Sequence, residues 1–163
     1  MRSVSDIVVV SGDPQPGSRT LHLATLVGER LAEQRGHTPP VLVDVAELGA
    51  GVLTPGDEAS DQALLDVQEA TVLVVASPAC KGSYAGALKA LLDRLPANAL
   101  AGVVAVPVVT ADVQPMADLA ETFLARLLGA LGADVVDFGL TATQSELIDP
   151  SFVADQYVAA YGS

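Results

Sequence analysis

The chain has 163 residues, 50% of them hydrophobic, and a formal net charge of −12. This length suits one core, so we expect residues 1–163 to form a single domain. The negative charge disfavours nucleic acid and anionic membrane surfaces as partners. No apolar run approaches the roughly 20 residues that cross a bilayer, and no secretion signal opens the chain. With Cys80 as the single cysteine and no histidine spacing that suits a metal site, we expect a cytoplasmic protein without a metal.

Valine-rich runs alternate with segments of helical period along the chain. The runs predict strands at residues 7–10, 41–45, 72–76, 103–109 and 135–138. Apolar stripes predict helices over residues 23–31, 61–69 and 88–95, with the stretch 49–60 as a loop. Another helix follows Pro115 and ends near Gly132, with a stripe made of Met116, Leu119, Ala120, Phe123, Leu127 and Leu131. A last helix begins after Asp149 and carries Val153, Tyr157 and Tyr161.

Continuous apolar strands that alternate with helices are typical of a parallel sheet covered on both faces. Such a domain is doubly wound, and with five strands its common order is 2-1-3-4-5. Ligands then bind at the carboxyl ends of the strands, where the order reverses between the first and third strands. This rule brings together residues 11–20, 77–84 and 110–115, which we name the first, middle and third loops.

The first loop joins a strand to a helix, which is where an α/β protein holds a phosphate. N–H groups in the first turn of a helix lack partners, and the peptide dipoles favour negative charge there. Gly17, Ser18 and Thr20 suit this geometry, and Arg19 adds a cation. The same residue types are also typical of an ordinary capped turn, so both interpretations stay open. The glycines do not match the dinucleotide spacing GxGxxG.

The middle loop holds the most distinctive motif of the chain. Lys81-Gly82-Ser83-Tyr84 follows Pro78 and leads into Gly86, Leu88, Lys89 and Asp93. This segment and residues 12–20 resemble the NADPH-dependent FMN reductase family, relatives of flavodoxin, and the resemblance spans nearly the whole chain. It implies a flavodoxin-like, doubly wound, five-stranded parallel sheet of order 2-1-3-4-5, with helices on both faces.

The resemblance implies an NAD(P)H-dependent FMN reductase that transfers a hydride from NADPH or NADH through FMN to free flavin or another small acceptor. The cofactors carry this chemistry, so no catalytic side chain is required. Relatives form homodimers or homotetramers, and a monooxygenase or an active homologue is a further candidate partner. The implied cofactor-binding residues are Ser11, Asp13, Gln15, Gly17, Ser18, Arg19, Thr20, Pro78, Ala79, Cys80, Lys81, Gly82, Ser83, Thr110, Ala111 and Asp112.

All three loops depart from the family pattern. Asp13 and Gln15 stand where relatives usually carry Ser and Arg, and Cys80 replaces a usual Tyr. Ala111 and Asp112 replace two glycines of a Thr-Gly-Gly turn. A carboxylate beside a phosphate is repulsive unless it turns away or a proton or cation intervenes. An alternative is therefore a family member without flavin catalysis that acts as a binding or partner subunit.

Two other functions share this topology and are disfavoured. A signalling receiver needs an acidic pair after the first strand and an aspartate at the end of the third, but the third strand ends at Ala76, Ser77 and Pro78. A one-electron carrier of the flavodoxin kind would suit the acidic charge, but the middle loop resembles that of the reductases.

Overall fold

The computed structural model describes residues 6–36 and 38–161, and the strands in this part of the chain form one parallel sheet. The strands are β1 (Ile7–Ser11), β2 (Val41–Asp44), β3 (Val72–Pro78), β4 (Val104–Ala111), β5 (Asp134–Val135) and β6 (Leu140–Thr143). Their order is β2-β1-β3-β4-β5, with β6 also paired to β4, and every pair is parallel. This confirms the flavodoxin-like, doubly wound sheet that the sequence predicts.

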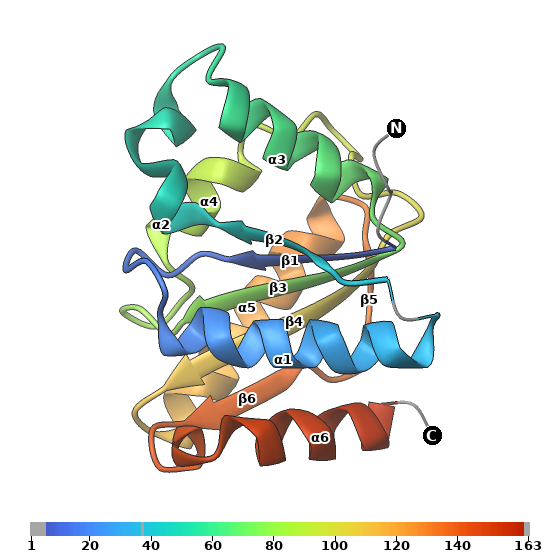
Figure 1. The fold of residues 1–163 in the computed structure, drawn as a ribbon. Coiled ribbons are helices and arrows are strands. Elements are labelled where there is room, and N and C mark those ends of the chain that lie inside the picture. Colours follow the sequence, from blue (N-terminus) through green and yellow to red (C-terminus); the bar gives the residue numbers. More distant parts are fainter. Residues whose placement is uncertain (1–5, 37, 162–163) are drawn as a thin grey trace.

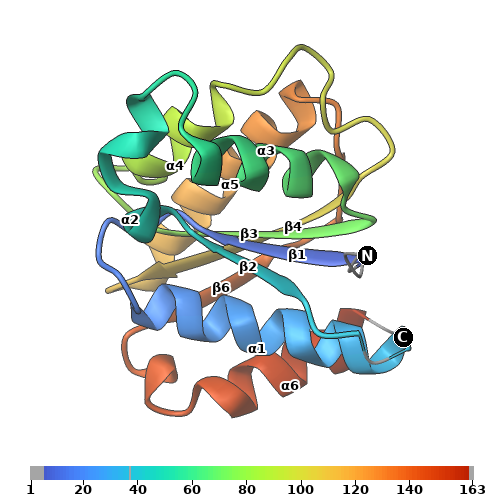
Figure 2. The ribbon, with the colours of Figure 1, turned by 45° about the horizontal axis from the view of Figure 1, so that its top comes forward.

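Helices cover both faces of the sheet (Figures 1 and 2). On one side lie α1 (Arg19–Gln34) and α6 (Pro150–Tyr161). On the other lie α3 (Glu58–Glu69), α4 (Gly86–Leu92) and α5 (Gln114–Ala130), with α2 (Val45–Leu48) and the 3-10 turn η1 (Gly49–Leu53) beside them. A second 3-10 turn, η2 (Glu146–Ile148), precedes α6. Among the described residues, no helix is long and apolar enough to cross a bilayer.

Successive strand residues supply the two cores in turn, because side chains alternate between the faces of a sheet. In β1, Val8 and Val10 pack on the side of α3, α4 and α5, whereas Ile7 and Val9 pack on the side of α1 and α6. Valines in β3 and β4 repeat this division. Both cores therefore hold the sheet rigid and position the loops that leave its edge.

The last strand position differs from the prediction of a single strand over residues 135–138. β4 pairs with β5 through Val104 and Ala105, and then with β6 from Val108 onward. Ala105 accepts a hydrogen bond from the N–H of Val136 at 3.1 Å. Pro107, two residues further, faces the same side and has no N–H to donate, so the ladder breaks there.

Gly139 crosses the break closely enough that an added Cβ would lie 2.5 Å from the Pro107 carbonyl oxygen. Phe138, which we expected inside the strand, is therefore outside the ladder and 58% exposed. The strand resumes at Leu140, which pairs with Val108. The predicted fifth strand is thus two short strands in place of one, and β6 lies next to the carboxyl-terminal half of β4.

The helices α1 and α6 agree with the sequence, but α5 turns a different face to the core. Its buried residues are Ala117, Ala120, Leu124 and Leu128. Three residues of the predicted stripe, Met116, Leu119 and Phe123, are 41%, 48% and 39% exposed. Apolar residues surround more than half of this helix, and the small side chains of Ala117 and Ala120 let it pack closely on the sheet. Ala120 is buried and Leu127 and Leu131 pack against the core, so the predicted stripe is confirmed in half of its residues.

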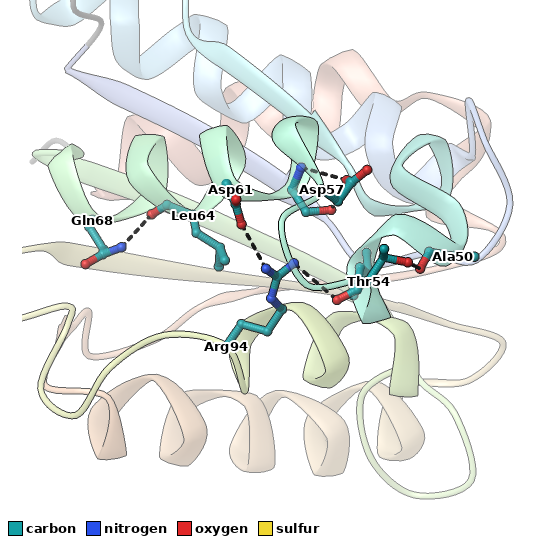
Figure 3. A network of polar contacts seen from close by, with 9 residues as sticks. Ala50, Thr54, Asp57, Asp61, Leu64, Gln68 and Arg94 are labelled. Carbon is teal, nitrogen blue, oxygen red and sulfur yellow. Dashed lines mark hydrogen bonds and ion pairs between the residues drawn. The ribbon is translucent and has the colours of Figure 1, made fainter.

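The stretch 49–60, predicted as a loop, contains η1 and the start of α3. Asp57 caps α3, and its Oδ2 accepts hydrogen bonds from the Ser60 N–H at 3.0 Å and from the Ser60 hydroxyl at 2.7 Å. These bonds hold the pKa of Asp57 below its usual value. Arg94, just after α4, donates to Asp61 at 2.8 Å (Figure 3). It also donates to the carbonyl of Val52 at 3.3 Å. Helix α4 ends at Leu92 and not at Leu95, where the sequence predicted its end, so Arg94 lies just outside the helix.

Candidate functional site

The three loops meet at one edge of the sheet, on the left of Figure 1. Gly12 in the first loop donates its N–H to the carbonyl of Ala76 at 2.8 Å. Ala79 in the middle loop donates to the carbonyl of Thr110 at 2.7 Å. The hydroxyls of Thr20 and Thr110, both buried, are 2.9 Å apart. Hydrogen bonds thus join each loop to a strand or loop beside it.

The first loop also lies against the helix that follows the middle loop. A Cβ added to Gly12 would lie 2.3 Å from the Cβ of Leu88 in α4 and 3.2 Å from its Cα. No side chain fits at such a distance, so glycine lets the loop backbone pass directly beside the helix. This contact fixes the first loop relative to the helix that begins after Tyr84.

The middle loop contains a tight two-residue turn. Cys80 and Ser83 exchange backbone hydrogen bonds of 2.7 and 3.0 Å. Between them, Lys81 and Gly82 have φ angles of +48° and +85°, the left-handed pair of a type I′ turn. Lysine is strained in this conformation, and such strain is concentrated at ligand-binding sites. Within the part of the chain described here, neither the Lys81 nor the Gly82 N–H donates a hydrogen bond.

Ser77 supports the base of the middle loop. It is fully buried, its Oγ accepts a hydrogen bond from the N–H of Ala85 at 2.8 Å, and it donates to the carbonyl of Pro78 at 2.8 Å. Its role is therefore to fix the two ends of the loop. Cys80 and Lys81 are exposed at the tip, and Ala79, Gly82 and Ser83 are partly exposed.

The first loop uses several of its own donors. Ser18 caps α1, because its Oγ accepts from the N–H of Leu21 at 3.1 Å. Asp13 Oδ1 accepts from the N–H of Gln15 at 2.9 Å, and Asp13 Oδ2 accepts from the Thr20 hydroxyl at 3.1 Å. A hydroxyl has one hydrogen, so Thr20 accepts at its oxygen from the Thr110 hydroxyl. A continuous chain of hydrogen bonds runs from Thr110 through Thr20 to Asp13.

Two residues of this region were not predicted from the sequence. Asp44 ends β2, is 9% exposed, and accepts from the N–H of Gly17 at 3.2 Å. Gln144, just after β6, accepts from Arg19 at 2.8 Å. The predicted order 2-1-3-4-5 already placed the end of the second strand beside the first loop, so the role of Asp44 could have been inferred from the sequence. The role of Gln144 could not, because the last strand was predicted at residues 135–138 and not directly before Gln144.

The remaining predicted site residues divide into two groups. Ser11 is buried at the end of β1, and its Oγ accepts weakly from the Asp13 N–H at 3.4 Å. Ala111 packs into the core on the side of α4 and α5, so its methyl group belongs to the core. Gln15 and Asp112 are exposed at the rim of the three loops.

A flavin ring and a phosphate fit this edge unequally. The middle loop offers two uncommitted N–H groups in a rigid turn, which suits the hydrogen-bond acceptors of a ring system. In the first loop, Asp13 and Asp44 already occupy the Gln15 N–H, the Gly17 N–H and the Thr20 hydroxyl. The N–H groups of Ser18, Arg19 and Thr20 carry no hydrogen bond there. The middle loop therefore offers free donors to a ring, whereas the first loop combines three free N–H groups at the start of α1 with two carboxylates that already hold its other donors.

The sheet order and the loops at its switch point define a flavodoxin-like protein. An NADH:FMN oxidoreductase crystal structure, in its apo form, matches with a TM-score of 0.78 and 28% identity, over 94% of this chain and 88% of that one. An oxidoreductase structure from Corynebacterium diphtheriae shares the fold, with a TM-score of 0.77 and 20% identity over 96% of this chain and 97% of that one.

The sequence model of the NADPH-dependent FMN reductase family matches residues 5–144, and the chain belongs to that family. SfnE, an NADH-dependent FMN reductase of Pseudomonas putida, is 30% identical over 154 residues, which cover 91% of this chain and 82% of that protein. An FMN reductase (NADPH) of Escherichia coli K12 is 40% identical over 83 residues, 51% of this chain. That second match spans only 44% of the relative's length.

Proposed function

We propose that the chain is an NAD(P)H-dependent flavin reductase whose flavin ring is held by the middle and third loops. The observation that carries this proposal is the strained turn at the switch point, with the N–H groups of Lys81 and Gly82 uncommitted. Bound flavin supplies hydride acceptance from nicotinamide and electron transfer onward, to free flavin or another small acceptor. Membership of the FMN reductase family supports the use of both cofactors.

The chain's own residues need only bind and orient in this reaction. Lys81 and Gly82 offer donors to the ring, Pro78 and Ser77 fix the loop that presents them, and Cys80 and Asp112 border the ring site. No acid, base or nucleophile is required of the protein, because the hydride passes between two cofactors. The reaction therefore depends on loop geometry more than on any titrating side chain.

The exposed face of α5 supports the homodimer or homotetramer expected from the family. Met116, Leu119 and Phe123 form an apolar strip on this helix, and Leu119 reaches within 3.7 Å of the Cβ position of Gly82. A second copy seated on this strip would lie beside the middle loop and shield the ring site from water. Phe123→Asp is expected to shift the chain toward monomer in light scattering. A cytoplasmic location and a monooxygenase partner remain predictions.

Oxidation of NADH and NADPH by the purified chain, with FMN or riboflavin added, tests the proposed activity. Absorbance of the reduced nicotinamide should fall with added flavin, and flavin fluorescence should be quenched by the protein. The carboxylates in the first loop favour a second candidate, a family member that binds a partner without catalysis. That candidate predicts neither turnover nor quenching with either flavin.

A further inference from the structure

The first loop already contains a negative charge at the strand-to-helix turn, where an α/β protein can hold a ligand's phosphate. The Asp13 carboxylate accepts from the Gln15 N–H and from the Thr20 hydroxyl, at 2.9 and 3.1 Å. The buried Asp44 carboxylate, which is 9% exposed, accepts from the Gly17 N–H at 3.2 Å. The two carboxylates thus accept three hydrogen bonds from donors of the first loop.

A phosphate at the remaining donors would meet these carboxylates at close range. The uncommitted N–H groups belong to Ser18, Arg19 and Thr20, and the Thr20 hydroxyl in that same turn is bound to Asp13. The cation of the loop, Arg19, is exposed and bonded to Gln144. Like charges placed next to one another in a binding site strongly disfavour the ligand that brings the second charge.

A hydroxyl group would meet the same carboxylates favourably. An ionised carboxylate only accepts hydrogen bonds, and each oxygen can accept more than one. A flavin whose ribityl chain ends in a hydroxyl therefore presents a donor to Asp13 or Asp44, where a phosphate presents only more negative charge. The loop thus matches a neutral, hydrogen-bond-donating tail.

We propose that this chain selects flavins without a terminal phosphate, of the riboflavin type, and that Asp13 is the residue that rejects FMN. This inference rests on the proposed flavin reductase function and names the substrate class of that site. Asp13 acts as an internal substitute for the phosphate that the loop would otherwise bind.

Asp13 is not needed to complete the helix that follows it. Ser18 caps α1 through the Leu21 N–H, as Asp57 caps α3 through the Ser60 N–H. Asp13 makes its bonds outside that cap, to the loop and to the Thr20 side chain. Asp13→Ser should therefore fold, with α1 still capped, and Asp13→Asn removes the charge while keeping the size of the side chain.

Fluorescence titrations of riboflavin and FMN with the full chain test the proposal. Wild type is expected to bind riboflavin about tenfold more tightly than FMN, or better, a ratio in the range of a like-charge contact. Asp13→Ser and Asp13→Asn should each raise FMN affinity by about tenfold relative to riboflavin affinity, because each variant loses both the repulsion of the phosphate and the charged acceptor for the ribityl hydroxyl. Circular dichroism confirms that each variant is folded.

Asp134→Ser is the matched control for net charge. Asp134 is exposed and opens β5 opposite Val104, the first residue of β4, at the far edge of the sheet. Its removal deletes the same unit of charge and should leave the preference for riboflavin unchanged. A gain in FMN affinity equal to that of Asp13→Ser would show that overall charge, not Asp13, sets the selectivity.

Three results separate the possible failures. FMN binding by wild type as tight as riboflavin binding overturns this inference and leaves the reductase function standing. An unchanged preference in both folded Asp13 variants also overturns it. Binding of neither flavin by wild type overturns the reductase function together with the inference that depends on it.

Discussion

The first and middle loops leave the same edge of the sheet, yet their backbone donors are in opposite states. In the middle loop, the Cys80 and Ser83 pairing turns the N–H groups of Lys81 and Gly82 away from any partner among the described residues. In the first loop, Asp13 and Asp44 bind donors that are otherwise available to a ligand. One half of the site is thus open to a ring, whereas the other half already contains anions.

The contrast separates a loop that offers backbone donors from a loop whose donors are held by its own side chains. The middle loop depends on backbone conformation, which Ser77 and the turn enforce whatever its exposed side chains are. In the first loop, side chains determine which donors are free, because the Asp13 and Asp44 carboxylates hold the Gln15 and Gly17 N–H groups.

Gly12→Ala is the largest expected disturbance, because it separates the first loop from the helix after the middle loop. The added Cβ would overlap Leu88, and the free energy of unfolding should fall by about 1–3 kcal/mol. Urea denaturation measures this loss. Gly86→Ala is the control, since its Cβ would meet nothing within 4 Å and its helical position tolerates alanine. Equal stability of both variants would contradict the close contact.

Thr110→Val breaks the hydrogen-bond chain between the third and first loops. The buried Thr20 hydroxyl loses the donor to its oxygen, so unfolding free energy should fall by about 1–2 kcal/mol. Thr122→Val removes a hydroxyl that bonds only to the Asp118 carbonyl within α5, and should cost less than about 0.5 kcal/mol. Thermal denaturation of both variants compares them. A Thr110→Val protein as stable as wild type would show that the two loops are not joined this way.

Lys81→Gly tests the strain of the middle loop. Glycine adopts a φ of +48° without steric cost, but it loses more backbone entropy on folding than lysine does. The two terms nearly cancel, so we expect a change within about 1 kcal/mol and flavin-ring affinity close to that of wild type. A large loss of binding would mean that the Lys81 side chain, and not the backbone turn, holds the ligand.

Asp57→Asn is expected to change the stability least. Asp57 caps α3 outside the three loops, so it serves as a comparison for Asp13. The pKa of Asp57 is lowered in the folded state, chiefly by its hydrogen bond with the Ser60 side chain. A lowered folded pKa stabilises the protein above the ordinary aspartate pKa, and the gain is lost as pH falls through the folded value. Melting temperatures of wild type and variant should differ at neutral pH and converge in acid. A difference that stays constant with pH would rule out this role.

Much of the fold could be predicted because buried parallel strands have continuous apolar sequences. The four strands that begin at Ile7, Val41, Val72 and Val104 follow directly from valine-rich segments. The split between β5 and β6 could not be predicted from those segments alone, because it depends on Pro107 in the neighbouring strand β4. The predicted stripe on α5 was right for Ala120, Leu127 and Leu131 and wrong for the exposed Met116, Leu119 and Phe123, because apolar residues lie on both sides of that helix.

The site was predicted as a meeting of loops, and the structure brings those loops together. The repulsive character of Asp13 was visible in the sequence, but its hydrogen-bond partners were not, since the Thr20 side chain meets it only after the loop folds back. The Asp44 contact depends on β2 and β1 being neighbours in the sheet. Contacts between residues that are distant in the sequence could therefore be identified only from the structure.

The coupling between Asp13 and Thr20 measures whether the Asp13 carboxylate occupies the donors of the first loop. A double-mutant cycle with Asp13→Ser, Thr20→Val and the double variant measures their coupling through unfolding free energies. A hydrogen bond from a hydroxyl to a charged carboxylate predicts a coupling of about 1–2 kcal/mol. A coupling of zero would mean that the Asp13 carboxylate does not bond to Thr20, which would contradict its place at the donors of the first loop.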